Sequence, residues 1–318
     1  QYHKLSGKRI AIDASLYIYQ CLMNVRHDGK YLTNNDDKVT SHISGIFYKN
    51  INLLSNNITP VYIFDGKPPI EKSEVIKCRQ EKAKVAKTQL ENAISDETCS
   101  ESTKDKLEKK TIRLTKTHID DIKHLLNLMG IEYLHIDGEA EAIASELCRI
   151  GYVDYVITED MDSLTFGCPN LIRNCMDKSL KRKDMISIIN LDTILKDMDL
   201  SYEQFVELCI LCGCDYCNNI PRIGQVKAYS FIKEFGSIEK FLESNPKFKI
   251  PEDYVEKYTR SKELFMMYRN KLNPSEMPFI NSSLDIASLL KYLISECEID
   301  ESKILGTIKK IQERYNSD

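Results

Sequence analysis

Residues 8–22 read KRIAIDASLYIYQCL, and this stretch contains the first indication of the fold. Residues 9–12, which are apolar from Ile10 onward, have the length and composition of a short buried strand that ends at Asp13. The spacing that follows predicts a helix that carries Tyr17 and Tyr19. A strand that gives way to a helix at an acidic residue is typical of open α/β sheets, whose functional residues gather at the strand ends.

Motifs further along the chain also place acids at the ends of predicted elements. The runs VYIF and DYVIT predict strands that end near Asp65 and Asp160, and IEYLHI predicts another strand. A helix that starts near Gly138 would carry Glu139 and Glu141 in its first turn, where free backbone N–H groups stabilise negative charge. We therefore predict an α/β fold with a mostly parallel central sheet flanked by helices.

These motifs and the later GCDYC supply seven carboxylates to one predicted site. An extended backbone at Asp160-Met-Asp162 would point both carboxylates to the same side. Like charges packed together raise one another's pKa, and hard divalent cations relieve the repulsion. A site of carboxylates alone suits two Mg²⁺ ions, with Mn²⁺ able to substitute, and phosphodiester hydrolysis is its commonest use. The predicted ligands are Asp13, Asp65, Glu139, Glu141, Asp160, Asp162 and Asp215.

The composition is that of a folded, soluble, intracellular protein. The 318 residues are 42% hydrophobic and 29% charged, and we find neither an apolar run long enough to span a bilayer nor a signal peptide. Eleven cysteines without framework spacing indicate free thiols in a reducing compartment. Two Cys-x-x-Cys pairs lie too close together for the usual zinc site, so we expect thiols rather than ligands at Cys209, Cys212, Cys214 and Cys217.

The net charge of −4 hides an uneven distribution of charge. Basic residues concentrate at 72–87, 104–116 and 178–183, either as solvated helix faces or as a nucleic-acid footprint. Residues 71–117 contain twelve basic and nine acidic residues, few large apolar ones, and turn-forming residues at 95–103. This segment therefore predicts two helices that project from the sheet and meet at an exposed tip.

After Leu200 the sequence predicts mostly helices. In LCGCDYCNNIPRIGQVKAYSFI, Gly224 would start a helix whose free N–H groups can bind a DNA phosphate, with Lys227 one turn in. A glycine between two helices is also ordinary helix-end chemistry, which leaves both interpretations open. The chain contains no nucleotide-binding loop of the Walker type.

The motifs IAIDAS, PVYIFDGKPP, EAEA, TEDMDSLTFG and LCGCDYC, in this order and spacing, resemble the flap endonucleases of the XPG/Rad2 family. The resemblance covers almost the whole chain. It implies a single nuclease domain, 1–318, whose parts are listed in chain order: an N-terminal nuclease region (about 1–70), a helical arch (about 71–117), an internal nuclease region (about 118–215), and a helix-hairpin-helix with C-terminal helices (about 216–318).

The resemblance also implies roles for individual residues. The seven acids match the two-metal site of the family, and Lys72 and Arg79 match basic residues that contact the scissile phosphate. Tyr19 matches a tyrosine that stacks on a base, although packing in the core is the alternative for this residue. The remaining implied DNA contacts are Arg26, Lys49, Gly224 and Lys227. The arch would pass a 5′ single-stranded flap and order on DNA.

Three departures from the family pattern stand out. The family usually has Ile-x-Gly-Ile-Gly in the helix-hairpin-helix, where a K⁺ ion can bind, and this chain has Ile-Pro-Arg-Ile-Gly at 220–224. We expect duplex binding to survive this change. The sequence begins at Gln1 instead of the family's Met-Gly, and it lacks the Gln-x-x-aliphatic-x-x-aromatic-aromatic tail. The sliding clamp is a partner in the family, but these residues do not predict its binding.

The sequence thus predicts a Mg²⁺-dependent, structure-specific 5′ flap endonuclease that acts in DNA replication and repair on branched or flapped DNA. The resemblance implies a nuclear location, and we expect a monomer. Alternatives within the family are a 5′–3′ exonuclease, an excision-repair nuclease or a junction resolvase. Outside it, a catalytically inactive DNA-binding scaffold would not need all seven acids, and a magnesium phosphatase would not explain the arch.

Overall fold

A computed structural model describes residues 2–27, 30–96, 98–173, 186–244 and 248–315. Its main sheet has six strands in the order β5-β4-β1-β6-β7-β8, and every neighbouring pair is parallel except the antiparallel β7 and β8. This confirms the predicted mostly parallel α/β fold, although the sequence did not predict β7 and β8. The strands are β1 (Arg9–Asp13), β4 (Thr59–Phe64), β5 (Tyr133–His135), β6 (Tyr155–Ile157), β7 (Asn170–Arg173) and β8 (Ser187–Asn190).

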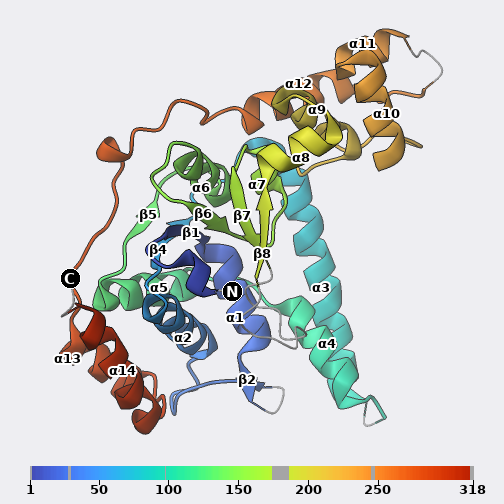
Figure 1. Ribbon diagram of the computed structural model, residues 1–318. Coiled ribbons are helices and arrows are strands. Elements are labelled where there is room, and N and C mark those ends of the chain that lie inside the picture. The colour runs from blue at the N-terminus through green and yellow to red at the C-terminus, as the bar shows by residue number, and fades with distance from the viewer. Residues whose placement is uncertain (1, 28–29, 97, 174–185, 245–247, 316–318) are drawn as a thin grey trace.

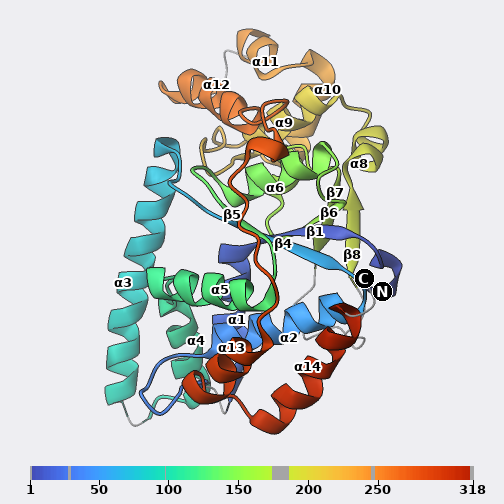
Figure 2. The same cartoon turned by 90° about the vertical axis from the view of Figure 1, so that its left-hand side faces the viewer.

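Both faces of the sheet are covered by helices (Figures 1 and 2). In β1, Ile10 and Ile12 pack into the core cluster on one face and Ala11 packs into the cluster on the other face, as the alternation of a strand requires. The first cluster includes residues of α1 (Ala14–Asn24), α2 (Ser41–Ser55) and α5 (Lys116–Met129). The second includes residues of α6 (Ala140–Arg149), α8 (Leu191–Met198) and α9 (Tyr202–Cys212).

The order of the strands creates a crevice at their carboxyl ends. The chain builds β1, β4 and β5 toward one edge and then returns to place β6 on the other side of β1. The connections that follow β1 and β6 therefore leave the sheet in different directions, which is where open α/β sheets bind ligands. Asp13, Asp65 and Asp160 come at or just after the ends of β1, β4 and β6.

The predicted arch is a pair of helices beside the sheet. After the short 3-10 helix η2 (Ile70–Lys72), α3 (Ser73–Ser95) and α4 (Glu101–Thr111) run side by side along one side of the molecule (Figure 1). The predicted break between two helices is confirmed, although α4 already begins at Glu101, and Ser100 caps α4 by accepting the N–H of Thr103 at 3.3 Å. In α3 the buried side chain is Ala86, and in α4, which is described in full, none is buried.

The C-terminal third is helical, as predicted, and forms two groups at opposite ends of the molecule (Figure 2). One group has its own core and combines α9 with α10 (Gln225–Phe235), α11 (Ile238–Ser244) and α12 (Tyr254–Phe265). The other packs near α2 and comprises α13 (Ile286–Leu290), a π-helix (Lys291–Glu296) and α14 (Glu301–Tyr315). Smaller elements are η1 (Tyr2–Leu5), β2 (Arg26–His27), β3 (Lys30–Tyr31), α7 (Asp162–Thr165) and η3 (Pro274–Glu276). Within the described ranges, no helix combines the length and apolar character that crossing a membrane requires.

We predict that the backbone amides of α4 and of the distal half of α3 exchange with solvent at least about a hundredfold faster than those of α2 and α5. The reason is that helices with almost no buried apolar surface open at low free-energy cost. Hydrogen–deuterium exchange with mass spectrometry on the free protein measures this directly. Equal protection of α4 and α5 would contradict the prediction.

Candidate metal and phosphate site

Asp13 lies at the centre of the candidate site. It is the last residue of β1 and caps α1, with Oδ1 accepting the N–H of Leu16 at 3.0 Å. Only 3% of the residue is exposed. Burial, together with the charges of Asp65 and Asp160, raises the pKa of Asp13 to about 7. The sequence placed Asp13 at this strand end, and the structure confirms that position.

A close backbone approach brings Asp65 beside the start of α6. Asp65 Oδ1 accepts the N–H of Ala140 at 2.9 Å, and the N–H of Gly66 donates to the carbonyl of Gly138 at 3.0 Å. A Cβ atom at position 66 would lie 2.3 Å from the carbonyl oxygen of Ile136, so only glycine permits this approach. The carboxylate after β4 is thereby held against the first turn of α6.

Glu139 and Glu141 are at the start of α6, as predicted, with Glu139 as its N-cap residue. Burial raises the pKa of Glu139, the ammonium of Lys72 opposes that rise, and the charges of Asp65 and Asp215 add to it. Burial and the charges of Asp13 and Asp65 raise the pKa of Glu141 well above its usual range. The two glutamates therefore interact with acids from β1, β4 and the loop after α9.

Asp160 and Asp162 do not lie on an extended segment, and that part of the prediction is wrong. Asp160 follows β6 in a turn, and Asp162 is the first residue of α7. One carboxylate oxygen of Asp160 accepts the N–H of Asp162 at 3.0 Å, which stabilises the turn. Both side chains still belong to the site, because burial and the charges of Asp160 and Asp215 raise the pKa of Asp162 to about 6.

Two cations from the base of the arch reach the acids. Lys72 Nζ donates to Glu139 and lies 3.1 Å from Oδ2 of Asp215. Arg79 Nη2 lies 3.2 Å from the same oxygen, and the Arg79 side chain is 62% exposed. Although burial favours the neutral amine, the charges of Glu139, Glu141 and Asp215 raise the pKa of Lys72. Both predicted cations are therefore at the site, with Lys72 inside it and Arg79 at its edge.

Tyr216 is a residue of the site that the sequence analysis missed. Its hydroxyl donates to the carboxylate of Glu139, and its ring centroid lies 6.0 Å from Nζ of Lys72. The ring packs edge-on against Phe265 of α12, with 5.2 Å between centroids. Its position directly after Asp215 was the available signal.

The donor set fits hard divalent cations. Burial, and after it the charges of neighbouring carboxylates, raise the pKa values of Asp13, Glu141 and Asp162, and Lys72 provides one buried positive charge among these acids. Oxygen ligands of this kind suit Mg²⁺. Among the described residues, however, no three potential ligand side chains are already arranged around one point. The structure thus shows a cluster of acids with Lys72 as its internal counter-ion, and its use as a metal site remains a prediction.

The other predicted DNA contacts lie on different elements. Tyr19, on α1, is half-buried and packs against the main core cluster. Lys49, on α2, is buried, with its ammonium 5.6 Å from the ring centroid of Tyr17, and this burial does not favour direct contact with DNA. The side chain of Arg26 and the basic run 178–183 lie outside the described part of the chain.

Gly224 is exposed and caps α10, as predicted. Arg222 has a φ of 71° and so adopts the left-handed conformation at the position where the family usually has glycine. Internal donors already bond two carbonyls of this turn: Lys227 Nζ donates to the Arg222 oxygen and Asn219 Nδ2 to the Ile223 oxygen, each at 3.0 Å. The turn is formed without the second glycine, and a K⁺ ion here remains a prediction.

The ten described cysteines are free thiols. In the Cys-x-x-Cys region, Cys217 is buried and the other three are half-buried. Burial raises the pKa of Cys209, Cys214 and Cys217 to about 12, so these three thiols are neutral at pH 7. Neutral thiols are poor metal ligands, because binding needs the thiolate.

Comparison with known proteins agrees with this geometry. Residues 1–86 match the XPG N-terminal domain and residues 130–215 match the XPG I-region. The chain belongs to the XPG family. All seven acids of the candidate site lie within these two matched regions, and so do Lys72 and Arg79. The members of this family are nucleases that hydrolyse phosphodiester bonds in DNA.

Individual relatives span most of the chain. Flap endonuclease 1 of Lodderomyces elongisporus is 39% identical over 97% of this chain and 80% of its own length. Flap endonuclease 1-A of Sorghum bicolor is also 39% identical, over 98% and 80%. Among solved structures, flap endonuclease-1 from Methanococcus jannaschii superposes with a TM-score of 0.74, at 28% identity over 100% of this chain and 96% of that chain. The catalytic core of Rad2 in complex with DNA substrate gives 0.69, at 25% identity over 98% and 95%.

We predict that Asp162→Asn stabilises the metal-free protein by on the order of 2 kcal/mol at pH 8. The pKa of Asp162 is raised in the folded state, so its ionisation costs stability as the pH rises from about 4 through 6. The gain should therefore shrink as the pH falls toward 4. Urea unfolding in EDTA across this pH range measures it.

The control for this prediction is Asp197→Asn, which removes an exposed acid of α8. It should change stability by less than about 0.5 kcal/mol. Added Mg²⁺ should stabilise the wild type more than Asp162→Asn. A destabilised Asp162→Asn protein in EDTA would contradict the idea that these acids repel one another.

We also predict that Arg222→Gly raises the free energy of unfolding by about 0.5–1 kcal/mol. Glycine adopts the left-handed conformation at this position without the steric cost that a side chain carries. Arg222→Val should lower stability, because β-branched residues tolerate positive φ least. Thermal unfolding of the two variants compares them, and equal midpoints would contradict the strain at this turn.

Proposed function

We propose that this chain is a magnesium-dependent, structure-specific 5′ flap endonuclease that cuts DNA near a single-strand/duplex junction. The observation that carries the proposal is the cluster of seven acids, two of which contact Lys72, next to the base of a two-helix arch. The similarity to proteins named flap endonuclease 1, at 39% identity over nearly the whole chain, supports it. Roles in DNA replication and repair, and a nuclear location, belong to the same proposal.

The seven acids would hold two Mg²⁺ ions. Bound Mg²⁺ supplies activation of water and stabilisation of the leaving oxygen in an in-line displacement. The chain itself supplies rigidity. Asp13 and Asp65 are each fixed by a backbone N–H group, and Glu139 is fixed by the Tyr216 hydroxyl. Ligands held in this way lose little freedom when substrate binds.

Lys72 and Arg79 are placed to contact the scissile phosphate. Both cations project from the base of the arch toward Asp215, and Arg79 is largely exposed at the edge of the cluster. A phosphodiester entering there would accept hydrogen bonds from both side chains. Donors of fixed position stabilise the charge that develops on the phosphoryl oxygens in the transition state.

The arch and the turn at 220–224 indicate which kind of DNA the protein would cut. A single strand can pass along a mixed-charge arch that carries a net charge of +3 between residues 71 and 117. The exposed Gly224 leaves the first backbone N–H groups of α10 open to a duplex phosphate. A protein with one element that binds a single strand and another that binds a duplex is suited to DNA in which a single strand joins a duplex.

The decisive experiment uses a 5′-labelled flap substrate in Mg²⁺ and in EDTA. We expect cleavage near the junction in Mg²⁺ only, because bound Mg²⁺ would activate the attacking water and stabilise the leaving oxygen. Asp160→Ala should lower the cleavage rate by about a thousandfold or more. Lys72→Ala should lower it by about a hundredfold.

Asp197→Ala, at an exposed position of α8, is the matched control and should cleave as the wild type does. Binding without cutting by the wild type would favour an inactive scaffold, and neither binding nor cutting would favour a phosphatase. A nicked duplex, a bubble and a four-way junction in the same assay distinguish an exonuclease, an excision-repair nuclease and a resolvase from a flap enzyme.

A further inference from the structure

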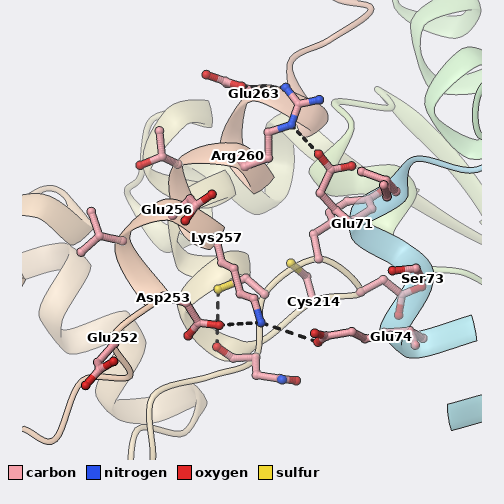
Figure 3. Close-up of a pocket in the computed structure, with 18 residues that line it drawn as sticks. Glu71, Ser73, Glu74, Cys214, Glu252, Asp253, Glu256, Lys257, Arg260 and Glu263 are labelled. Atoms are coloured by element: carbon pink, nitrogen blue, oxygen red, sulfur yellow. Dashed lines mark hydrogen bonds and ion pairs between the residues drawn. The ribbon is translucent and has the colours of Figure 1, made fainter. Parts of the chain in front are cut away.

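Two ion pairs join the base of the arch to α12 (Figure 3). Arg260 Nε donates to Oε1 of Glu71 at 2.6 Å, and Lys257 Nζ lies 3.6 Å from Oε2 of Glu74. The two cations are three residues apart on α12, and the two acids are three residues apart around the start of α3. We call these four residues the clasp.

The clasp crosses a cleft instead of joining two packed helices. A cavity of about 1020 Å³ separates the start of α3 from α12 and the loop at 214–218. Two apolar side chains at its rim, Ile70 and Val255, are 81% and 54% exposed and so do not close it. Polar bonds across this cleft therefore contribute directly to how the two helices are held relative to each other.

The two pairs of the clasp differ in strength. The Glu71 side chain is 19% exposed, and Arg260 bonds both Glu71 and, at 2.8 Å, Glu263. The bond to Arg260 lowers the pKa of Glu71. The Glu74 side chain is 74% exposed, and exposed pairs at such distances contribute little. The Arg260–Glu71 pair is thus the main connection.

Glu71 is adjacent to Lys72 in the three-residue turn η2. The two side chains point to different partners: Glu71 bonds α12, while Lys72 enters the acid cluster and contacts Glu139 and Asp215. Neighbouring residues of one short turn share their backbone orientation. Fixing Glu71 therefore restricts where the Lys72 ammonium can lie.

We infer that Arg260 and Glu71 are positioning residues that hold η2 so that Lys72 stays in the site, and that they couple α12 to the base of the arch. The inference rests on the flap-endonuclease function proposed above. Because α12 shares a core with α10, whose start is the proposed duplex contact, the clasp connects that contact to the residue proposed to bind the scissile phosphate. The pair acts on the reaction only through Lys72.

Two neutral substitutions, Arg260→Gln and Glu71→Gln, test the inference. One removes a positive charge and the other a negative charge, so a general electrostatic effect on DNA would change cleavage in opposite directions. The clasp instead predicts that both lower the maximal single-turnover rate on the flap substrate by about tenfold, since small misplacements of a catalytic group are costly. The half-saturating enzyme concentration should change by less than about threefold, and the double variant should be no slower than either single variant.

Glu252→Gln is the matched control, because Glu252 lines the same cleft and Figure 3 shows it at the other end from Arg260. It should cleave as the wild type does. In a Lys72→Ala background, Arg260→Gln should have no further effect. Opposite changes in the two single variants, a change confined to half-saturation, or additivity with Lys72→Ala would overturn the inference.

If the wild type does not cut flaps, the proposed function is refuted but the clasp is not. A second measurement then tests the clasp by itself. Hydrogen–deuterium exchange should show faster exchange at residues 70–79 in Arg260→Gln and in Glu71→Gln, and no change there in Glu252→Gln. Thermal unfolding midpoints should stay within about 2 °C of the wild type. Unchanged hydrogen exchange at residues 70–79 in both variants would be enough to refute the inference that the clasp positions η2.

Discussion

Repulsion among seven carboxylates is the constraint on which this structure depends. Burial and neighbouring charge raise the pKa of Asp13 to about 7 and that of Asp162 to about 6, so the site is costly to build without cations. Lys72 offsets part of that cost by contacting Glu139 and Asp215. The same lysine belongs to the base of the arch, so the arch and the acid cluster are joined by charge as well as by chain.

The fold makes this crowding achievable. Parallel strands end at the same edge of the sheet, and the change of direction between β1 and β6 opens a crevice there. Backbone bonds then hold individual acids in place, such as the N–H of Ala140 bonded to Asp65. Rigid elements bear the acids, whereas the arch beside them has almost no buried surface. This division suits the proposed function, in which the metal site would stay fixed while a single strand passes along the arch.

Much of the site could be predicted because the sequence directly around each acid indicates where that acid lies in its strand or helix. Asp13, Asp65 and Asp160 follow apolar runs with strand composition, and Glu139 and Glu141 begin a helix, so each position follows from short-range pattern. Prediction failed where geometry depends on the turn itself, as at Asp160-Met-Asp162, which is a turn and short helix instead of an extended segment. Strands β7 and β8 were not predicted. The run that forms β7 is short, and its place in the sheet comes from pairing with β6.

The sequence by itself determined the fold class, the family and the set of acids, because strand composition, helix starts and charged motifs are properties of neighbouring residues. Only the tertiary structure decided which partners those residues meet. Tyr216 at Glu139, Lys49 buried near Tyr17 and Arg260 bonded to Glu71 across 189 positions depend on how distant elements pack. Contacts of that range leave no periodic trace in the chain, since either partner alone looks like an ordinary surface or core residue.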